Sequence, residues 1–84
     1  MTIAAAPQRR DAEFNKVTAQ ELFIENDAGL LQVGLSANET GGMLGIYNKT
    51  GEGVVQLRAD QHGNGVVGVY NRKGLGRTLE PGPQ

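Results

Sequence analysis

Glycine, asparagine and aspartate interrupt this chain about every dozen residues, and no other feature restricts its fold as strongly. Of the 48 residues from 29 to 76, 12 are glycine. Each glycine costs a helix about 1 kcal/mol, so a long helix is excluded from this region. Between the interruptions lie six short apolar runs, at residues 17–25, 30–36, 43–48, 54–60, 66–71 and 77–80. Runs that start 11–13 residues apart and are separated by turn-forming residues predict six β-strands and an all-β protein.

The runs also form an internal repeat of 23–24 residues. Residues 45–53 align with residues 68–76 at an offset of 23, with five of nine positions identical, and residues 29–33 align with residues 53–57 at an offset of 24. Each unit holds two strands and cannot bury its apolar face alone, so units must stack on one another. The pattern fits an antiparallel β-meander and a parallel β-solenoid equally well.

Alternation along the runs predicts two unlike faces. Side chains alternate across a strand, so Val55 and Leu57 share one face, as do Val67 and Val69. The opposite face combines glycine with tyrosine, a combination that suits close approach by another backbone. We therefore expect an oligomer or binding face made of Tyr47, Tyr70, Gly45, Gly68, Met43 and Val66.

Size and composition predict that this sheet is completed by self-association. The 84 residues include only 20 Val, Leu, Ile and Phe and no Cys, so neither a large core nor a disulfide can stabilise a monomer. Residues 17–80 form the expected β-repeat domain, residues 1–16 a flexible arm with a short helical turn over 10–16, and residues 81–84 a tail. A homotrimeric prism and an open filament both fit this expectation.

No catalytic, metal or cofactor site is predicted. Residues 63–68 match the G-x-G-x-x-G pattern, but a β-run follows them where a dinucleotide site needs a helix. Residues 60–65 resemble the start of a calcium loop, yet position twelve of that loop is Asn71 in place of Glu, and a hairpin turn with positive φ at Asn64-Gly65 is favoured. The single histidine, His62, and the single serine, Ser36, are not in a nucleophile setting.

Charge and targeting signals indicate little about location. The net charge of −1 argues against nucleic acid or an anionic membrane as partner. The first ten residues lack the layout of a secretory signal, and no apolar stretch has the length of a membrane span. The location expected is cytoplasmic, in a virion, or reached by non-classical export. The Asn38-Glu39-Thr40 and Asn48-Lys49-Thr50 sequons are interpreted as turns.

The recurring motif apolar-Tyr-Asn-x-x-Gly, at residues 46–51 and 69–74, resembles bacterial β-repeat sequences with the pattern apolar-Tyr-Asn/Asp-x-x-Gly. It is more loosely similar to the trimeric β-helix and β-prism shafts of phage fibres. The resemblance implies an oligomeric structural protein, a subunit of a fibre, filament or trimeric shaft whose partner is another copy of itself. The alternative is a non-catalytic module that presents its Tyr/Gly face to carbohydrate or protein.

Overall fold

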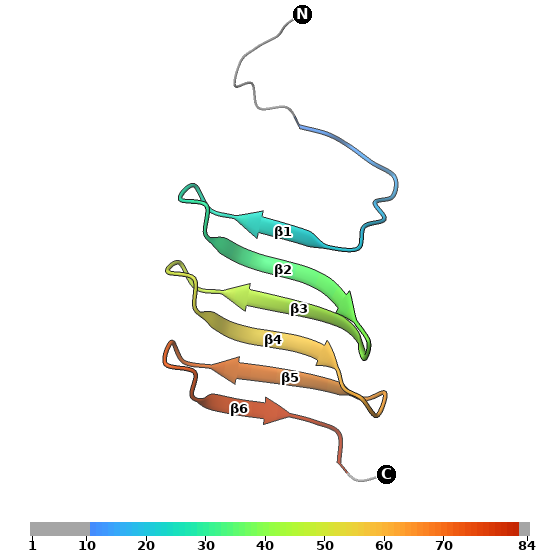
Figure 1. The fold of residues 1–84 in the computed structure, drawn as a ribbon, viewed down its shortest axis with the longest axis vertical. Coiled ribbons are helices and arrows are strands. Elements are labelled where there is room, and N and C mark those ends of the chain that lie inside the picture. The colour runs from blue at the N-terminus through green and yellow to red at the C-terminus, as the bar shows by residue number, and fades with distance from the viewer. Residues whose placement is uncertain (1–10, 83–84) are drawn as a thin grey trace, which may run out of the picture.

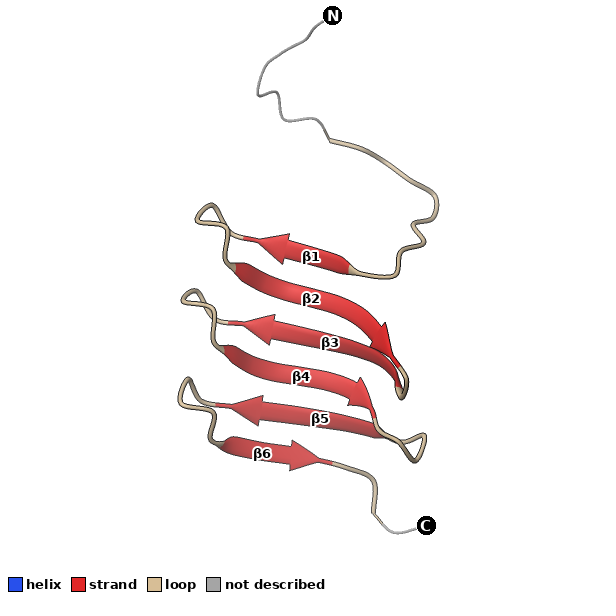
Figure 2. Cartoon of the chain, in the orientation of Figure 1, coloured by secondary structure: helices blue, strands red, loops and turns tan. Residues whose placement is uncertain are grey.

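The computed structural model describes residues 11–82, which form one open β-sheet of six antiparallel strands and contain no helix (Figures 1 and 2). The strands follow one another across the sheet in sequence order, so each pairs with its neighbours in the chain. Their bounds are β1 Leu22–Glu25, β2 Leu31–Asn38, β3 Gly41–Tyr47, β4 Gly53–Ala59, β5 Gly65–Tyr70 and β6 Gly76–Leu79.

The predicted all-β class and the six strands are confirmed, and the topology is that of the antiparallel meander. All five strand pairings among the described residues are antiparallel, so the parallel coils of a solenoid are not found there. The first strand is shorter than predicted, because residues 17–21 precede β1 without forming part of it. No helical turn forms over residues 11–16; Arg10 and the rest of the predicted arm lie outside the described residues.

Four of the five turns are built alike, and each begins with an Asn or Asp. The side-chain oxygen of this residue accepts hydrogen bonds from the backbone N–H groups two and four residues later, at 2.9–3.1 Å. The glycine three residues later has a φ between 82° and 94°, the left-handed region that glycine adopts without steric cost. These turns begin at Asn26, Asn48, Asp60 and Asn71.

The turns differ from the sequence-based expectation in one respect and agree with it in another. The glycine with a positive φ in the β4–β5 turn is Gly63, so the expectation of a positive φ at Gly65 was wrong; Gly65 is already the first residue of β5. The sequons are turn residues, as interpreted: the Asn38 and Asn48 side chains accept hydrogen bonds from both the backbone N–H and the hydroxyl of the threonine that follows.

The sheet has almost no interior of its own. Val66 is the single buried hydrophobic residue among those described, with 4% of its surface exposed. A single layer of strands has no second layer to exclude water from its faces. Both faces of the sheet are therefore candidates for interaction.

Candidate interaction surfaces of the sheet

One face of the sheet carries two continuous columns of apolar side chains, which we call the apolar face. The strand register places these side chains directly opposite one another from β1 to β6. The first column is Leu22, Leu35, Leu44, Leu57, Val67 and Leu79. The second is Ile24, Val33, Ile46, Val55, Val69 and Arg77. Eleven of these twelve positions are Leu, Ile or Val.

The apolar face is largely open to solvent. Near its middle, Leu57 keeps 41% of its surface exposed and Ile46 keeps 37%; on β5, Val69 keeps 57%. Six strands about 4.8 Å apart, each with two side chains on this face, span on the order of 29 Å by 14 Å. Such an area, about 400 Å², matches the largest apolar patch on a typical monomer, about 300–600 Å², which is often functional.

The opposite face carries a central row of mixed residues, and we call it the tyrosine face. Its central row is Phe23, Gly34, Gly45, Gln56, Gly68 and Thr78, and a second row beside it is Ser36, Met43, Arg58 and Val66. Polar side chains bond to each other here: Arg58 donates from Nε to Oε1 of Gln56 at 3.0 Å. This face is less apolar than the first, yet it holds the one buried side chain, that of Val66.

On this face, aromatic rings lie over glycines of their own sheet. A methyl group added to Gly45 would come within 3.3 Å of the Tyr47 ring and hydroxyl. One added to Gly68 would overlap the Tyr70 ring, 2.8 Å from Cε2. Rings that cover glycines shield backbone that would otherwise face water.

All six residues expected to form an oligomer or binding face lie on this tyrosine face. They share this face because they alternate with the apolar columns. The space above Gly45 and Gly68, however, is filled by Tyr47 and Tyr70 of the same chain. The glycines are explained by packing within the sheet, without a second backbone against them.

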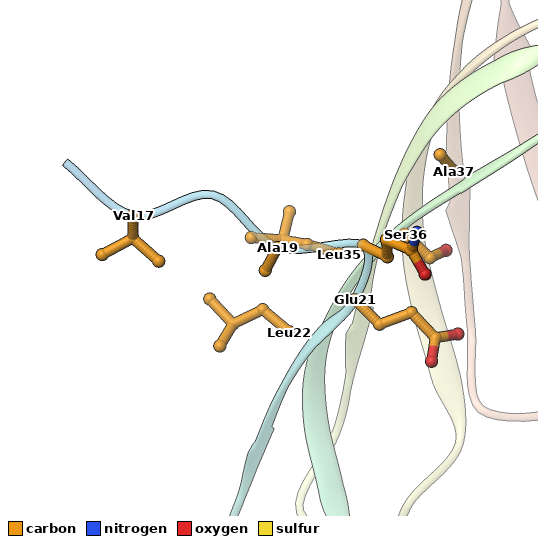
Figure 3. A pocket seen from close by; sticks show the side chains of 8 residues that line it. Val17, Ala19, Glu21, Leu22, Leu35, Ser36 and Ala37 are labelled. Atoms are coloured by element: carbon orange, nitrogen blue, oxygen red, sulfur yellow. The ribbon is translucent and has the colours of Figure 1, made fainter.

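Two of the depressions in the sheet bear on these faces. On one, Tyr47, Tyr70 and Gln56 line a pocket of about 100 Å³, smaller than the roughly 300–1,000 Å³ of typical ligand sites. The other, about 310 Å³, lies where the segment before β1 passes the end of β2 (Figure 3). Val17 and Leu22 line one side of it, and the Glu21 carboxylate points to the other side. This second pocket extends the apolar face beyond β1.

The titratable groups with altered pKa values serve the turns. The backbone N–H groups of Asn64 and His62 donate to the Asp60 carboxylate and hold its pKa below the ordinary value. The pKa of Glu52 is also lowered, first by a hydrogen bond from the Thr50 hydroxyl and then by the Asn48 side chain. Glu52 is exposed and Asp60 is half-buried, and the hydrogen bonds of both carboxylates lie within single turns.

Residues 11–82 contain no group of three His, Asp or Glu side chains that could hold a metal ion. Within the same range, no helix is long and apolar enough to cross a membrane. The G-x-G-x-x-G segment ends within β5, as the sequence predicted, and His62 is an exposed turn residue.

The sequence comparison matched the first repeat unit at an offset of 24, through residues 29–33 and 53–57, whereas the strand register and the turns match it at an offset of 22. The β1–β2 hairpin has the same columns and the same Asn turn as the β3–β4 and β5–β6 hairpins. Its residue before the turn is Glu25, where the other two hairpins have Tyr47 and Tyr70. The turn asparagines are 22 residues apart from Asn26 to Asn48 and 23 residues apart from Asn48 to Asn71. This spacing was the signal that could have revealed the match between the three hairpins.

The chain matches no known protein family, and no curated protein or solved structure is significantly similar to it. Its function must therefore be inferred from its own surfaces.

Proposed function

We propose that this protein is a structural subunit that self-assembles by burying its apolar face against further copies of itself. The observation that carries the proposal is the contrast between two continuous apolar columns and a sheet with one buried hydrophobic residue. Burial of apolar surface is the main favourable contribution to folding, at about 25 cal/mol per Å². A single open layer gains little of it, so a covering layer is needed for stability.

Another copy of the chain is the covering layer that fits best. Each copy offers the same two columns, so a face of matching width and chemistry is present wherever the protein is present. Closed oligomers are the commonest way in which identical chains bury such a face. Two copies would give a sandwich with sheets about 10 Å apart, and three would give a prism with the columns inside.

The resulting object is a rod or shaft rather than a catalyst. A prism or sandwich made of meanders grows along the direction of the strand-to-strand hydrogen bonds, with turns along its sides. The motif resemblance to bacterial β-repeats and to phage fibre shafts supports the same proposal. The subunit would thus serve in a fibre, filament or trimeric shaft.

Sedimentation of the wild-type protein tests this proposal together with a matched pair of variants. Leu57→Glu places a carboxylate in the middle of the apolar face, while Gln56→Glu places one on the adjacent residue of the same strand, which faces the other way. The wild-type protein and Gln56→Glu are expected to sediment as dimers, trimers or larger species. Leu57→Glu is expected to lose assembly and β-structure together, because an unpaired buried charge costs several kcal/mol.

Two results would contradict the proposed self-association. A wild-type species of 8.9 kDa with a full β-type circular dichroism spectrum would overturn the proposal. So would equal assembly of the two glutamate variants, because the apolar face would then be dispensable.

A further inference from the structure

The two edges of the sheet are unpaired among the described residues. β1 pairs only with β2, and β6 pairs only with β5, so the outer backbone N–H and C=O groups of both strands have no strand partner. Each edge strand has four residues, all exposed. Such edges are templates for pairing with another chain.

The sheet itself shows how one hairpin follows the next. At the β2–β3 junction, Leu35 lies opposite Leu44 and Val33 opposite Ile46. The β4–β5 junction repeats this arrangement, with Leu57 opposite Val67. Both junctions are antiparallel and keep the two apolar columns in line.

We propose that β6 of one copy pairs with β1 of the next, so that the meander continues from chain to chain. This inference rests on the proposed self-association and gives it a direction. β6 and β1 run in opposite directions, as an antiparallel junction requires (Figure 1). The register of the internal junctions then places Leu79 opposite the next copy's Leu22, Thr78 opposite its Phe23, and Arg77 opposite its Ile24.

Charge favours this head-to-tail pairing over pairing of like edges. Glu25 and Asp27 lie at the β1 edge, whereas Arg72, Lys73 and Arg77 lie at the β6 edge. The β1–β2 and β5–β6 turns are at the same end of the sheet (Figure 2). In the continued meander the Arg72-Lys73 turn would stand about 10 Å from the next copy's Asp27, two strand spacings away. Antiparallel pairing of β1 with a second β1 would instead place Glu21 of one copy against Glu25 of the other, and would leave the basic turns without an acidic neighbour.

One contact opposes the junction. The same register places Glu80, just after β6, beside the next copy's Glu21, just before β1. Like charges directly opposite in a sheet are destabilising. Glu80→Gln is therefore expected to lengthen the assemblies, a result that a purely face-to-face oligomer does not predict.

Complementary charge variants test the junction directly. The first variant, Glu25→Lys with Asp27→Lys, makes the β1 edge basic like the β6 edge. The second, Arg72→Glu with Lys73→Glu, makes the β6 edge acidic like the β1 edge. Lysine already occupies the matching turn position at Lys49, so the first variant keeps a turn that this chain tolerates.

Each variant alone is expected to form assemblies at least about tenfold shorter than wild type in electron micrographs at low salt, because like charges then meet at every junction. An equimolar mixture is expected to restore the length, since a basic β1 edge meets an acidic β6 edge and the reverse. Restoration by mixing also shows that both variants are folded. Wild-type length in either variant alone, or no recovery in the mixture, overturns the junction.

Failure of the edge pairing and failure of the proposed self-association give different results in sedimentation. If only the edge pairing is wrong, the wild-type protein is a closed small oligomer in sedimentation and forms no long assemblies. If self-association through the apolar face is wrong, the Leu57→Glu variant matches the wild-type protein in sedimentation.

Discussion

The two faces of this sheet differ in how far side chains of the same chain cover them. On the tyrosine face, the rings of Tyr47 and Tyr70 lie over glycines, and Val66 is buried within a single chain. On the apolar face, branched side chains stand side by side, and Leu57, Ile46 and Val69 remain more than a third exposed. The first face is partly covered by side chains of its own chain, whereas the second is left open, and we propose that another copy covers it. Glycine beside an aromatic residue therefore indicates packing within a sheet as readily as contact between chains.

The largest expected change in the free energy of unfolding comes from a charge placed on the apolar face. Val69→Asp should lower the free energy of unfolding by several kcal/mol, because the carboxylate would be buried without a partner once the face is covered. The control, Lys49→Asp, changes an exposed turn residue and should alter stability by less than about 0.5 kcal/mol. Thermal melts of both variants make the comparison. Since Val69 is 57% exposed in the single sheet, similar melting temperatures would mean that no second layer covers it.

A smaller loss of stability is expected from a methyl group added at Gly76, in the β5–β6 pair. Gly76 lies opposite Tyr70, and a Cβ there would overlap the backbone carbonyl oxygen of Val69. Gly76→Ala should destabilise the protein by about 1–3 kcal/mol, as overpacking does elsewhere. Gly65→Ala is the control, because nothing lies within 4 Å of its added methyl group. Equal denaturation midpoints for the two variants would contradict the packing described for the β5–β6 pair.

The smallest expected change in stability concerns the turns, which connect the strands and belong to neither face. The pKa of Asp60 is lower in the folded state, so its carboxylate contributes stability above its unfolded pKa and loses it as pH falls through the folded value. Asp60→Asn should therefore be less stable than wild type near neutral pH, and the difference should vanish in acid. Urea titrations across this pH range measure it. A difference that is constant with pH would show that the charge is not involved, as in the three turns that begin with Asn.

The sequence predicted the sheet better than it predicted the use of its faces. Alternation in runs such as residues 54–60 fixes which side chains share a face, and Asn-x-x-Gly fixes the turns, because both depend on local geometry. Where Tyr47 and Tyr70 would lie depends on rotamers and neighbours, which a spacing pattern does not encode. The first hairpin was matched at a different offset for a related reason: its turn is retained, while Glu25 stands in the place of the tyrosine.

The meander topology has a mechanical consequence. Every strand pairs only with its neighbours in sequence, and β1 and β6 form the opposite edges of the sheet. Tension applied through residues before β1 and after β6 is therefore directed across the sheet, so that strands peel away one after another and few hydrogen bonds resist at any moment. A second layer against the apolar face would have to slide or separate before any strand could leave. Assembly would then convert a sheet that unzips under load into a rod that carries it.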